Sequence, residues 1–319
     1  MAIRFGTPLA VVILLVGAVA AGAQSAAAVK PPANEDCLTC HEDVTKPFAS
    51  STHAAASCVD CHADLSKVQE FPHSETVAAV SCAVCHEDIA SQYHDGIHAW
   101  AKEKAGLKMA PACADCHGTH DIAPKTDAAS RTYRDNVPAT CGKCHEGVTE
   151  RFNHSVHAAV LKSGNSGAPV CVDCHAAHAT QRSDVPAWRL SVAAECGSCH
   201  QDVVETFRRT FHGKVTELGF TRVAACADCH GAHDILPASN PASTIAKGKL
   251  VETCGSCHQG ANEKFVQYDP HPNPRSHARS PLLWWINQFY TVLIAGCFGL
   301  FGLHSLLWFR RERQETRRS

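Results

Sequence analysis

Aromatic side chains are scarce in this chain of 319 residues, and methionine is nearly absent. Phe, Trp and Tyr make up 7% of the sequence, and the two methionines are Met1 and Met109. Because aromatic rings supply much of the apolar area of protein cores, side chains alone are too few here to build a large core. The formal net charge of −2 indicates no particular partner, and no nucleic acid is expected.

Cysteine and histidine are in excess, with 19 and 22 copies. Eighteen cysteines fall into nine Cys-x-x-Cys-His motifs. The motif cysteines are Cys37, Cys40, Cys58, Cys61, Cys82, Cys85, Cys113, Cys116, Cys141, Cys144, Cys171, Cys174, Cys196, Cys199, Cys226, Cys229, Cys254 and Cys257. The motif histidines are His41, His62, His86, His117, His145, His175, His200, His230 and His258.

This motif is the attachment signature of c-type haem, in which two thiols bond the porphyrin and the adjacent imidazole binds iron. A disulfide framework or zinc sites would also use paired cysteines. Neither alternative explains a histidine directly after every second cysteine. The sequence therefore predicts nine covalently bound c-type haems, whose apolar plates would supply the core that the side chains lack.

The nine motifs alternate between two kinds. Kind A begins at Cys37, Cys82, Cys141, Cys196 and Cys254. Kind B begins at Cys58, Cys113, Cys171 and Cys226, and has an aspartate before its second cysteine (Asp60, Asp115, Asp173 and Asp228). The alternation predicts paired-motif repeats over 37–81, 82–140, 141–195 and 196–253, and a half repeat over 254–268. Repetition of this kind is typical of an elongated array in which each unit mainly contacts its neighbours.

Further histidines follow the motifs at recurring offsets, and they are the predicted second axial ligands of the irons. Five follow kind A motifs: His53, His98, His157, His212 and His271. Four follow kind B motifs: His73, His120, His178 and His233. His73 and His271 depart from the offsets of the others. A solvated or helix-capping role is the alternative for each, and the spacing does not assign them to individual haems.

The segments after kind A motifs have apolar residues at every fourth position, as in Val203, Phe207 and Phe211. This period predicts a short helix that carries the second-ligand histidine. Glycines at 106, 164 and 219 stand where such helices would end, as C-cap glycines do. The predicted fold is mainly α with little regular secondary structure: short helices and loops wrapped around stacked haems.

The N-terminal residues 1–23 have the features of a signal peptide, with Arg4, an apolar run and a small-residue cleavage site. An uncleaved anchor is the alternative. Export fits covalent haem attachment, which in bacteria takes place outside the cytoplasmic membrane. Residues 24–268 are therefore expected to form a haem domain in the periplasm.

A second apolar run, 282–309, contains no charged residue and is long enough to cross a membrane. A Pro-rich linker, 269–281, precedes it, and a basic tail, 310–319, follows it. The positive-inside rule places this tail in the cytoplasm. The expected location is thus the cytoplasmic membrane, crossed once, with the soluble domain in the periplasm. A buried soluble helix is the alternative.

His304 lies inside the apolar run, where an ionisable side chain is a candidate functional group. It is a candidate contact for a b-type haem or a quinone. Snorkelling to the interface is the alternative. Cys297, in the same run, belongs to no motif and is expected to pack.

The paired C-x-x-C-H units from Cys37 to His271 resemble the periplasmic multihaem c-type cytochromes of the doubled-motif, cytochrome c3-like kind. The resemblance implies closely stacked haems and a role in electron transfer. The stretch F-G-L-H-S-L-L-W-F-R-R at 301–311 is similar to the tether that joins such domains to cytochrome b561-like, quinol-oxidising membrane subunits. It implies a b-type or quinone-linked partner on a separate polypeptide, and redox partners in the periplasm.

Three functions follow as hypotheses. The first is a membrane-anchored electron conduit without catalytic residues, since iron with two histidine ligands has no vacant site for substrate. Histidine–methionine ligation is nearly excluded because Met109 is the only methionine after residue 23. The second is a reductase of a small nitrogen or sulfur oxyanion, which needs one open iron. The third is a redox sensor, for which a tail of about ten residues is too short to fold into an output domain.

Overall fold

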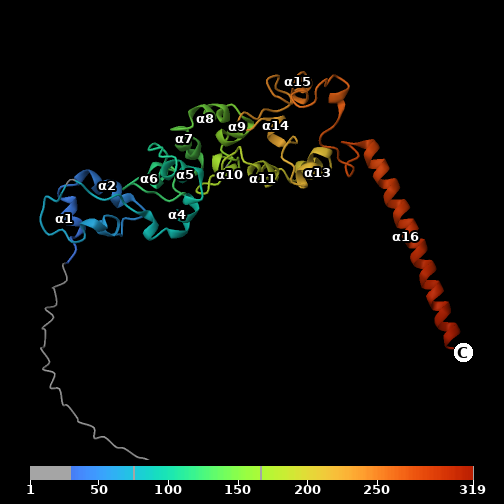
Figure 1. The fold of residues 1–319 in the computed structure, drawn as a ribbon, viewed down its shortest axis with the longest axis horizontal. Helices are drawn as coiled ribbons and strands as arrows, with labels where there is room; N and C mark the ends of the chain where they lie inside the picture. Colours follow the sequence, from blue (N-terminus) through green and yellow to red (C-terminus); the bar gives the residue numbers. More distant parts are fainter. Residues whose placement is uncertain (1–29, 75, 166, 319) are drawn as a thin grey trace, which may run out of the picture. The chain divides into compact units, whose positions relative to one another are not determined.

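The computed structural model describes residues 30–74, 76–165 and 167–318. In these ranges the chain forms helices and loops and contains no strand (Figure 1). The prediction of a mainly α protein with short elements is confirmed at this level. The predicted signal peptide, 1–23, lies outside the described residues.

The chain forms two compact units. The described part of the first comprises residues 30–40, 57–74 and 76–80. Its helices are α1 (Asn34–Leu38), α3 (Cys58–Cys61) and the short 3₁₀ helix η1 (Ala63–Leu65). The side-chain oxygen of Asn34 accepts a hydrogen bond of 2.8 Å from the backbone N–H of Cys58, which ties α1 to the start of α3.

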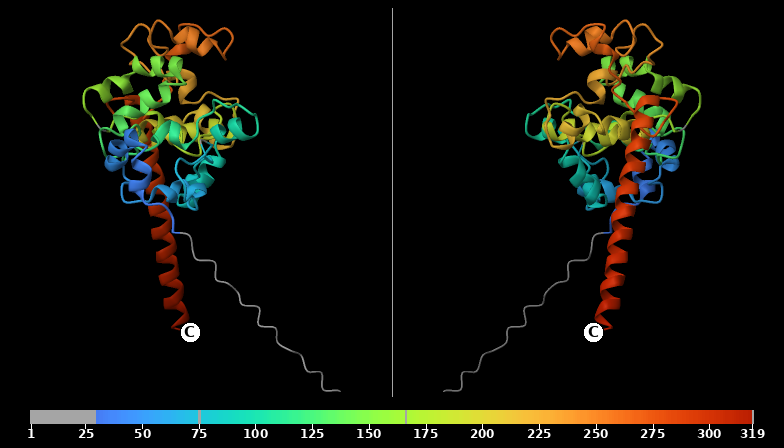
Figure 2. Two further views of the ribbon diagram at one scale, coloured as in Figure 1. Left: turned by 90° about the vertical axis from the view of Figure 1, so that its left-hand side faces the viewer. Right: turned by 90° about the vertical axis from the view of Figure 1, so that its right-hand side faces the viewer.

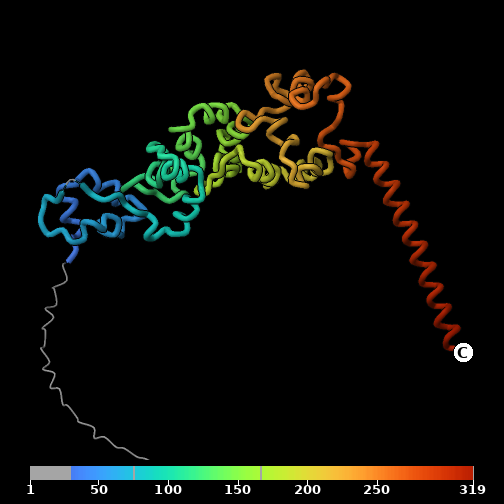
Figure 3. Tube along the Cα trace, in the orientation of Figure 1, coloured from blue at the N-terminus to red at the C-terminus, as the bar shows by residue number. Residues whose placement is uncertain are grey.

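The second unit comprises residues 41–56 and the described chain from 81 onward. It contains α2 (Glu42–Ser50), η2 (Cys82–Val84), α4 (Glu87–His94), α5 (Ile97–Glu103), α6 (Cys113–His117), η3 (Arg134–Asn136), α7 (Val137–Gly142), α8 (Glu146–Asn153), α9 (Val156–Lys162), α10 (Cys171–Cys174), α11 (Pro186–Gly197), α12 (Gln201–Arg208), α13 (Phe211–Glu217), α14 (Cys226–His230), α15 (Leu250–Gly255), η4 (Phe265–Gln267) and α16 (Pro281–Thr316). Figure 3 shows how much of the trace between the short helices is loop.

The helix that was predicted after the kind A motifs is instead two helices after the motifs of Cys82, Cys141 and Cys196, which corrects the sequence analysis. The motif of Cys37 is followed by the single helix α2, and the motif of Cys254 by the short 3₁₀ helix η4. The chain turns between α8 and α9 and again between α12 and α13. At these turns the side chains of Ser155 and Thr210 accept hydrogen bonds from backbone N–H groups of α9 and α13. Such caps start a new helix although the apolar period continues across the break.

The second-ligand histidines His98, His157 and His212 lie in the first turn of the second helix of each pair. His53 lies in a turn after α2, and His271 lies in irregular chain. The glycines expected at the ends of these helices are confirmed, because residues 106, 164 and 219 have φ of 69°, 83° and 86°. An L side chain rarely adopts that conformation.

Few large side chains are buried in the described chain. The buried apolar residues are mostly alanine and valine, with Phe207 the largest, and no large side chain is completely buried. Figure 2 shows the short helices and the loops that connect them from two further sides. The polypeptide described here thus lacks a large apolar core, as its scarcity of aromatic residues predicts.

The C-terminal helix α16 has 36 residues and is long and apolar enough to cross a membrane, and none of its residues is buried. It confirms that a single helix near the C-terminus could anchor the chain. The helix does not end with the apolar run at 309, but continues through most of the basic tail to Thr316. Arginine-rich sequence remains helical here because Arg, Glu and Gln are good helix formers.

Candidate metal centres

Seven of the nine motif histidines lie beside a second imidazole, and each partner is one of the predicted second ligands. The ring centroids of every pair are 6.0–6.3 Å apart. The pairs are His86 with His53, His145 with His98, His200 with His157, His258 with His212, His117 with His178, His175 with His233, and His230 with His271.

This separation suits a metal ion between the two rings. Two metal–nitrogen bonds of about 2 Å each, added to the distance from each nitrogen to its ring centroid, come to roughly 6 Å. Each pair therefore has room for one metal ion between its two rings. In the described ranges, no group of three or more His, Cys, Asp or Glu side chains is arranged to hold a metal ion.

The partners follow a rule of direction. The four paired kind A motif histidines each face a histidine of the preceding repeat, as His145 faces His98. The three paired kind B motif histidines each face a histidine of the following segment, as His117 faces His178. His271, which the spacing groups with the kind A ligands, lies against the kind B histidine His230.

Backbone hydrogen bonds between repeats hold this register. The N–H of Ile97, next to the kind A ligand His98, donates to the carbonyl of Thr180, two residues after the kind B ligand His178. The N···O distance is 2.7 Å. Equivalent bonds run from Thr52 to Ile122 and from Val156 to Ile235, at 2.8 and 2.9 Å. One repeating contact thus positions both kinds of second ligand.

The other two motif histidines, His41 and His62, and the other two predicted second ligands, His73 and His120, lie outside these seven pairs and have contacts of their own. One of these contacts joins Nδ1 of His73 to the carbonyl oxygen of Ser74 at 2.6 Å.

Burial lowers the pKa of several paired imidazoles. It lowers the pKa of His157, and the facing ring of His200 lowers it further. The same two causes lower the pKa of His98, beside His145, and of His175, beside His233. Neutral imidazole is the form that binds a metal, so the environment favours the ligand state.

Motifs that are consecutive in sequence also lie close together in space. In the repeats that begin at Cys37, Cys141 and Cys196, the first cysteines of the two motifs are hydrogen-bonded. The bond between Cys141 and Cys171 lowers the pKa of Cys171 to about 7. Between repeats, burial raises the pKa of Cys174, and the nearby first cysteine of the next motif, Cys196, raises it further. Contacts of these two types join the six motifs from Cys113 to Cys254 without interruption.

The kind B aspartate has a structural role that the sequence analysis did not assign. In each kind B motif its carboxylate accepts a hydrogen bond of 2.6–2.8 Å from the backbone N–H of the residue before the first cysteine. This contact closes the first turn of the short motif helix. The sequence could have indicated this role, because each of these aspartates occupies the third position of the short motif helix.

Two arginines near kind B motifs were also missed. Arg134 forms an ion pair with Asp173 at 2.7 Å, and Arg189 forms one with Asp228 at 3.0 Å. Each arginine precedes its aspartate by 39 residues and lies seven residues before a kind A motif, a periodicity that is visible only when the repeats are aligned.

The remaining histidines lie apart from the pairs. His94 forms an exposed ion pair with Glu103 at 2.9 Å. The ring of His277 contacts Trp284 edge to face, with centroids 5.1 Å apart, at the start of α16. His304 and Cys297 are exposed on α16.

Comparisons with known proteins give no match: no family model, no curated protein and no solved structure is similar to this chain.

Proposed function

We propose that the chain is a membrane-anchored, multihaem c-type cytochrome that relays electrons between a quinol-linked or b-type membrane partner and acceptors in the periplasm or outside the cell. One observation carries the proposal. Seven imidazoles that directly follow Cys-x-x-Cys each face a second imidazole at 6.0–6.3 Å. The covalent attachment motif and a two-histidine axial site thus coincide seven times.

The residues around these pairs fit a large apolar group. The motif cysteines are at least partly accessible, so their thiols are available for thioether bonds. The described polypeptide has no completely buried large side chain of its own. Nine bound haems would supply both the missing core and one-electron redox chemistry.

The paired histidines favour a relay over an enzyme. Two imidazoles occupy both axial positions of a site, which leaves no position for a substrate. The reductase hypothesis needs an open iron, and none of the seven pairs offers one. The protein residues in these sites therefore act to hold, separate and shield the redox groups rather than to bind a reactant.

The continuous contacts between motifs support long-range transfer. From Cys113 to Cys254, each motif has a cysteine close enough to the next motif to interact with it electrostatically. Groups attached at these cysteines would be near neighbours in the order of the sequence. A repeat array wrapped around stacked haems is the arrangement that this order supports.

The membrane assignment depends on α16. Its apolar length would anchor the chain in the cytoplasmic membrane, and its five arginines from 310 to 318 would lie in the cytoplasm. The motif-bearing chain then faces the periplasm. A quinol-oxidising, b-type subunit is the proposed membrane partner.

The test is an electron paramagnetic resonance spectrum of the oxidised full-length protein extracted from membranes, with spins counted against haem measured as pyridine haemochrome. We expect nine haems per chain, with all irons low-spin. A high-spin signal from about one iron in nine would instead support the reductase hypothesis. A protein that contains zinc or disulfides and no haem would overturn the proposal.

A further inference from the structure

All kind B motifs contain an aspartate before the second cysteine, but in the ranges that the structure describes only some of these aspartates form an ion pair with an arginine. Asp115 accepts a backbone hydrogen bond from Ala112 and has no ion pair within the described chain. Asp173 and Asp228 make the same backbone bond, from Val170 and Ala225, and each is also paired with an arginine. The carboxylate charge is therefore balanced at two of these three motifs.

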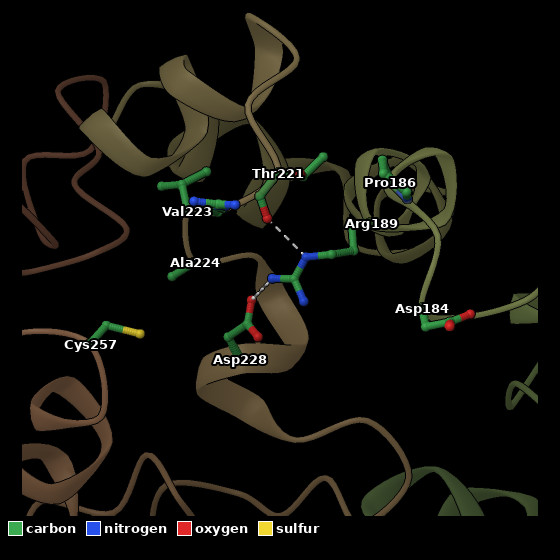
Figure 4. Close-up of a pocket in the computed structure, with 9 residues that line it drawn as sticks. Asp184, Pro186, Arg189, Thr221, Val223, Ala224, Asp228 and Cys257 are labelled. Carbon is green, nitrogen blue, oxygen red and sulfur yellow. Dashed lines mark hydrogen bonds and ion pairs between the residues drawn. The ribbon is translucent and has the colours of Figure 1, made fainter.

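Arg189 is built into its site by several contacts. Figure 4 shows its guanidinium group between the backbone of Thr221 and the carboxylate of Asp228. Its Nε donates to the Thr221 carbonyl at 3.0 Å, and a terminal nitrogen donates to Asp228 at 3.0 Å. Asp228 directly precedes the haem-attachment residue Cys229, so the positive charge lies beside the motif.

Arg134 has the equivalent place one repeat earlier. Its terminal nitrogens donate to both carboxylate oxygens of Asp173, at 3.3 and 2.7 Å, and one also donates to the carbonyl of Ala168. Its side chain is 32% exposed, so solvent screens the charge only partly. Seven residues before the kind A motif of Cys82, in the repeat before the one that contains Asp115, the corresponding sequence position is Glu75, which has the opposite charge.

The wider sequence has the same asymmetry. Residues 30–133 contain 15 Asp and Glu against 8 Lys and Arg. Residues 134–268 contain 13 of each. Negative surroundings stabilise the oxidised, more positive form of a redox centre and lower its midpoint potential, whereas a nearby cation raises it.

We propose that Arg134 and Arg189 raise the midpoint potentials of the haems attached at Cys171 and Cys226 above that of the haem attached at Cys113. This inference rests on the proposed function. The potentials of the kind B sites then rise toward the C-terminal repeats, so an electron is held more firmly there than at the acidic N-terminal repeats. The two arginines act by placing a positive charge beside the haem-attachment motifs. The resulting difference in potential gives electron transfer along the chain a preferred direction.

The test is a potentiometric titration of the full-length holoprotein, followed by haem absorbance, for wild type and Arg189→Gln. We expect about one of nine components to move to lower potential. At its original midpoint, its oxidised-to-reduced ratio should rise roughly threefold to tenfold, where tenfold corresponds to about 59 mV for one electron. Arg311→Gln, which removes an exposed arginine paired with Glu315 on α16, is the matched control and should leave the curve unchanged.

Two further variants separate charge from structure. Arg189→Lys keeps the charge but loses the two-pronged guanidinium geometry, and should titrate like wild type. Arg189→Gln combined with Asp228→Asn restores neutrality and should return the component to its original potential. Asp228→Asn alone keeps an oxygen for the Ala225 N–H and should raise the potential, which tests the proposal even if Arg189→Gln fails to fold.

An unmoved titration curve for both Arg189→Gln and Asp228→Asn, in proteins with nine low-spin haems, would overturn the role of the arginines and leave the proposed function intact. A downward shift in Arg189→Lys as large as in Arg189→Gln would also overturn it, because a structural contact would then be responsible. Absence of haem from the wild-type protein would overturn the proposed function itself.

Discussion

Kind A and kind B motifs have the same five-residue pattern but are built differently. A kind A motif lies at a junction: α7 ends within the motif of Cys141, and His145 caps the start of α8. A kind B motif forms a short helix of its own, α10 in the same repeat, closed by Asp173. The single aspartate thus decides whether the motif is a junction or an independent turn.

The two kinds also obtain their second imidazole from opposite directions. In the repeat 141–195, His145 faces a ring from the preceding repeat and His175 faces one from the following repeat. The same repeat gives His157 and His178 to its neighbours. This repeat therefore completes neither of its own two sites, and it is joined to each of its two neighbours in both directions.

The largest expected effect comes from removing one ligand of each kind. In the proposed cytochrome, His157→Ala should open the iron of the haem attached at Cys196, in the next repeat, and His178→Ala should open that of the haem attached at Cys113, in the previous one. Each variant should convert about one of nine irons to high spin, because a five-coordinate haem iron is usually high-spin. Electron paramagnetic resonance of the oxidised protein measures the fraction.

Double variants test the direction rule. His178→Ala with His117→Ala removes both histidines of one site, so one haem should be affected. His178→Ala with His175→Ala removes ligands of two sites, although these histidines belong to the same repeat. If the first combination perturbed two haems and the second only one, ligation within a repeat would replace the rule.

A smaller effect is expected where the two kinds of ligand meet. A Cβ added at Gly96 would lie 2.6 Å from the carbonyl oxygen of His178 and 3.2 Å from the backbone nitrogen of Thr180. Gly96→Ala should push the kind A and kind B ligand segments apart and lower the free energy of unfolding by about 1–3 kcal/mol. Guanidinium unfolding followed by haem absorbance measures the change.

Gly147→Ala is the control for this substitution, since a Cβ at residue 147 meets nothing within 4 Å and helix α8 favours alanine. It should be neutral or slightly stabilising. Equal losses in both variants would show that contact between the two ligand segments does not limit stability.

The smallest expected effect is on stability, and it comes from changing the residue before the second cysteine in a kind B and in a kind A motif. Asp173→Ala removes the N-terminal cap of α10 and the ion pair with Arg134, and should cost about 1–2 kcal/mol of unfolding free energy. Lys143→Ala changes the equivalent residue of the kind A motif and should stay within about 0.5 kcal/mol of wild type. Paired denaturation curves of the two holoproteins make the comparison, and a larger loss for Lys143→Ala would contradict the assigned role of the aspartate.

The sequence predicted the helical class, the C-terminal apolar helix and the candidate ligands, because these depend on local composition and spacing. It could not predict the pairs. His98 and His145 are 47 residues apart and His117 and His178 are 61 apart, with loops of unequal length between them. Contacts such as Ile97 to Thr180, which exist only in the folded chain, bring each pair together.

The break within the predicted helices was a different kind of error. The apolar period continues across it, so periodicity alone predicts one helix through Ser155 or Thr210. The hydroxyl groups of Ser155 and Thr210 accept hydrogen bonds from the backbone N–H groups three residues later. This local hydrogen bond starts a new helix and outweighs the apolar period. The breaks before α9 and α13 could have been located if the capping residues had been given more weight than the apolar period.

The position of His271 limits how far the last redox site can move from the membrane. Only nine residues lie between it and Pro281, where α16 begins, so ten Cα–Cα steps join the two. Even fully extended, at about 3.5 Å per residue, this segment spans no more than about 35 Å. The histidine of the final kind B site is thus held close to the start of α16 by a short connecting segment. In the proposed cytochrome, the length of this segment, rather than diffusion of a free domain, limits the distance that an electron must cross at the membrane.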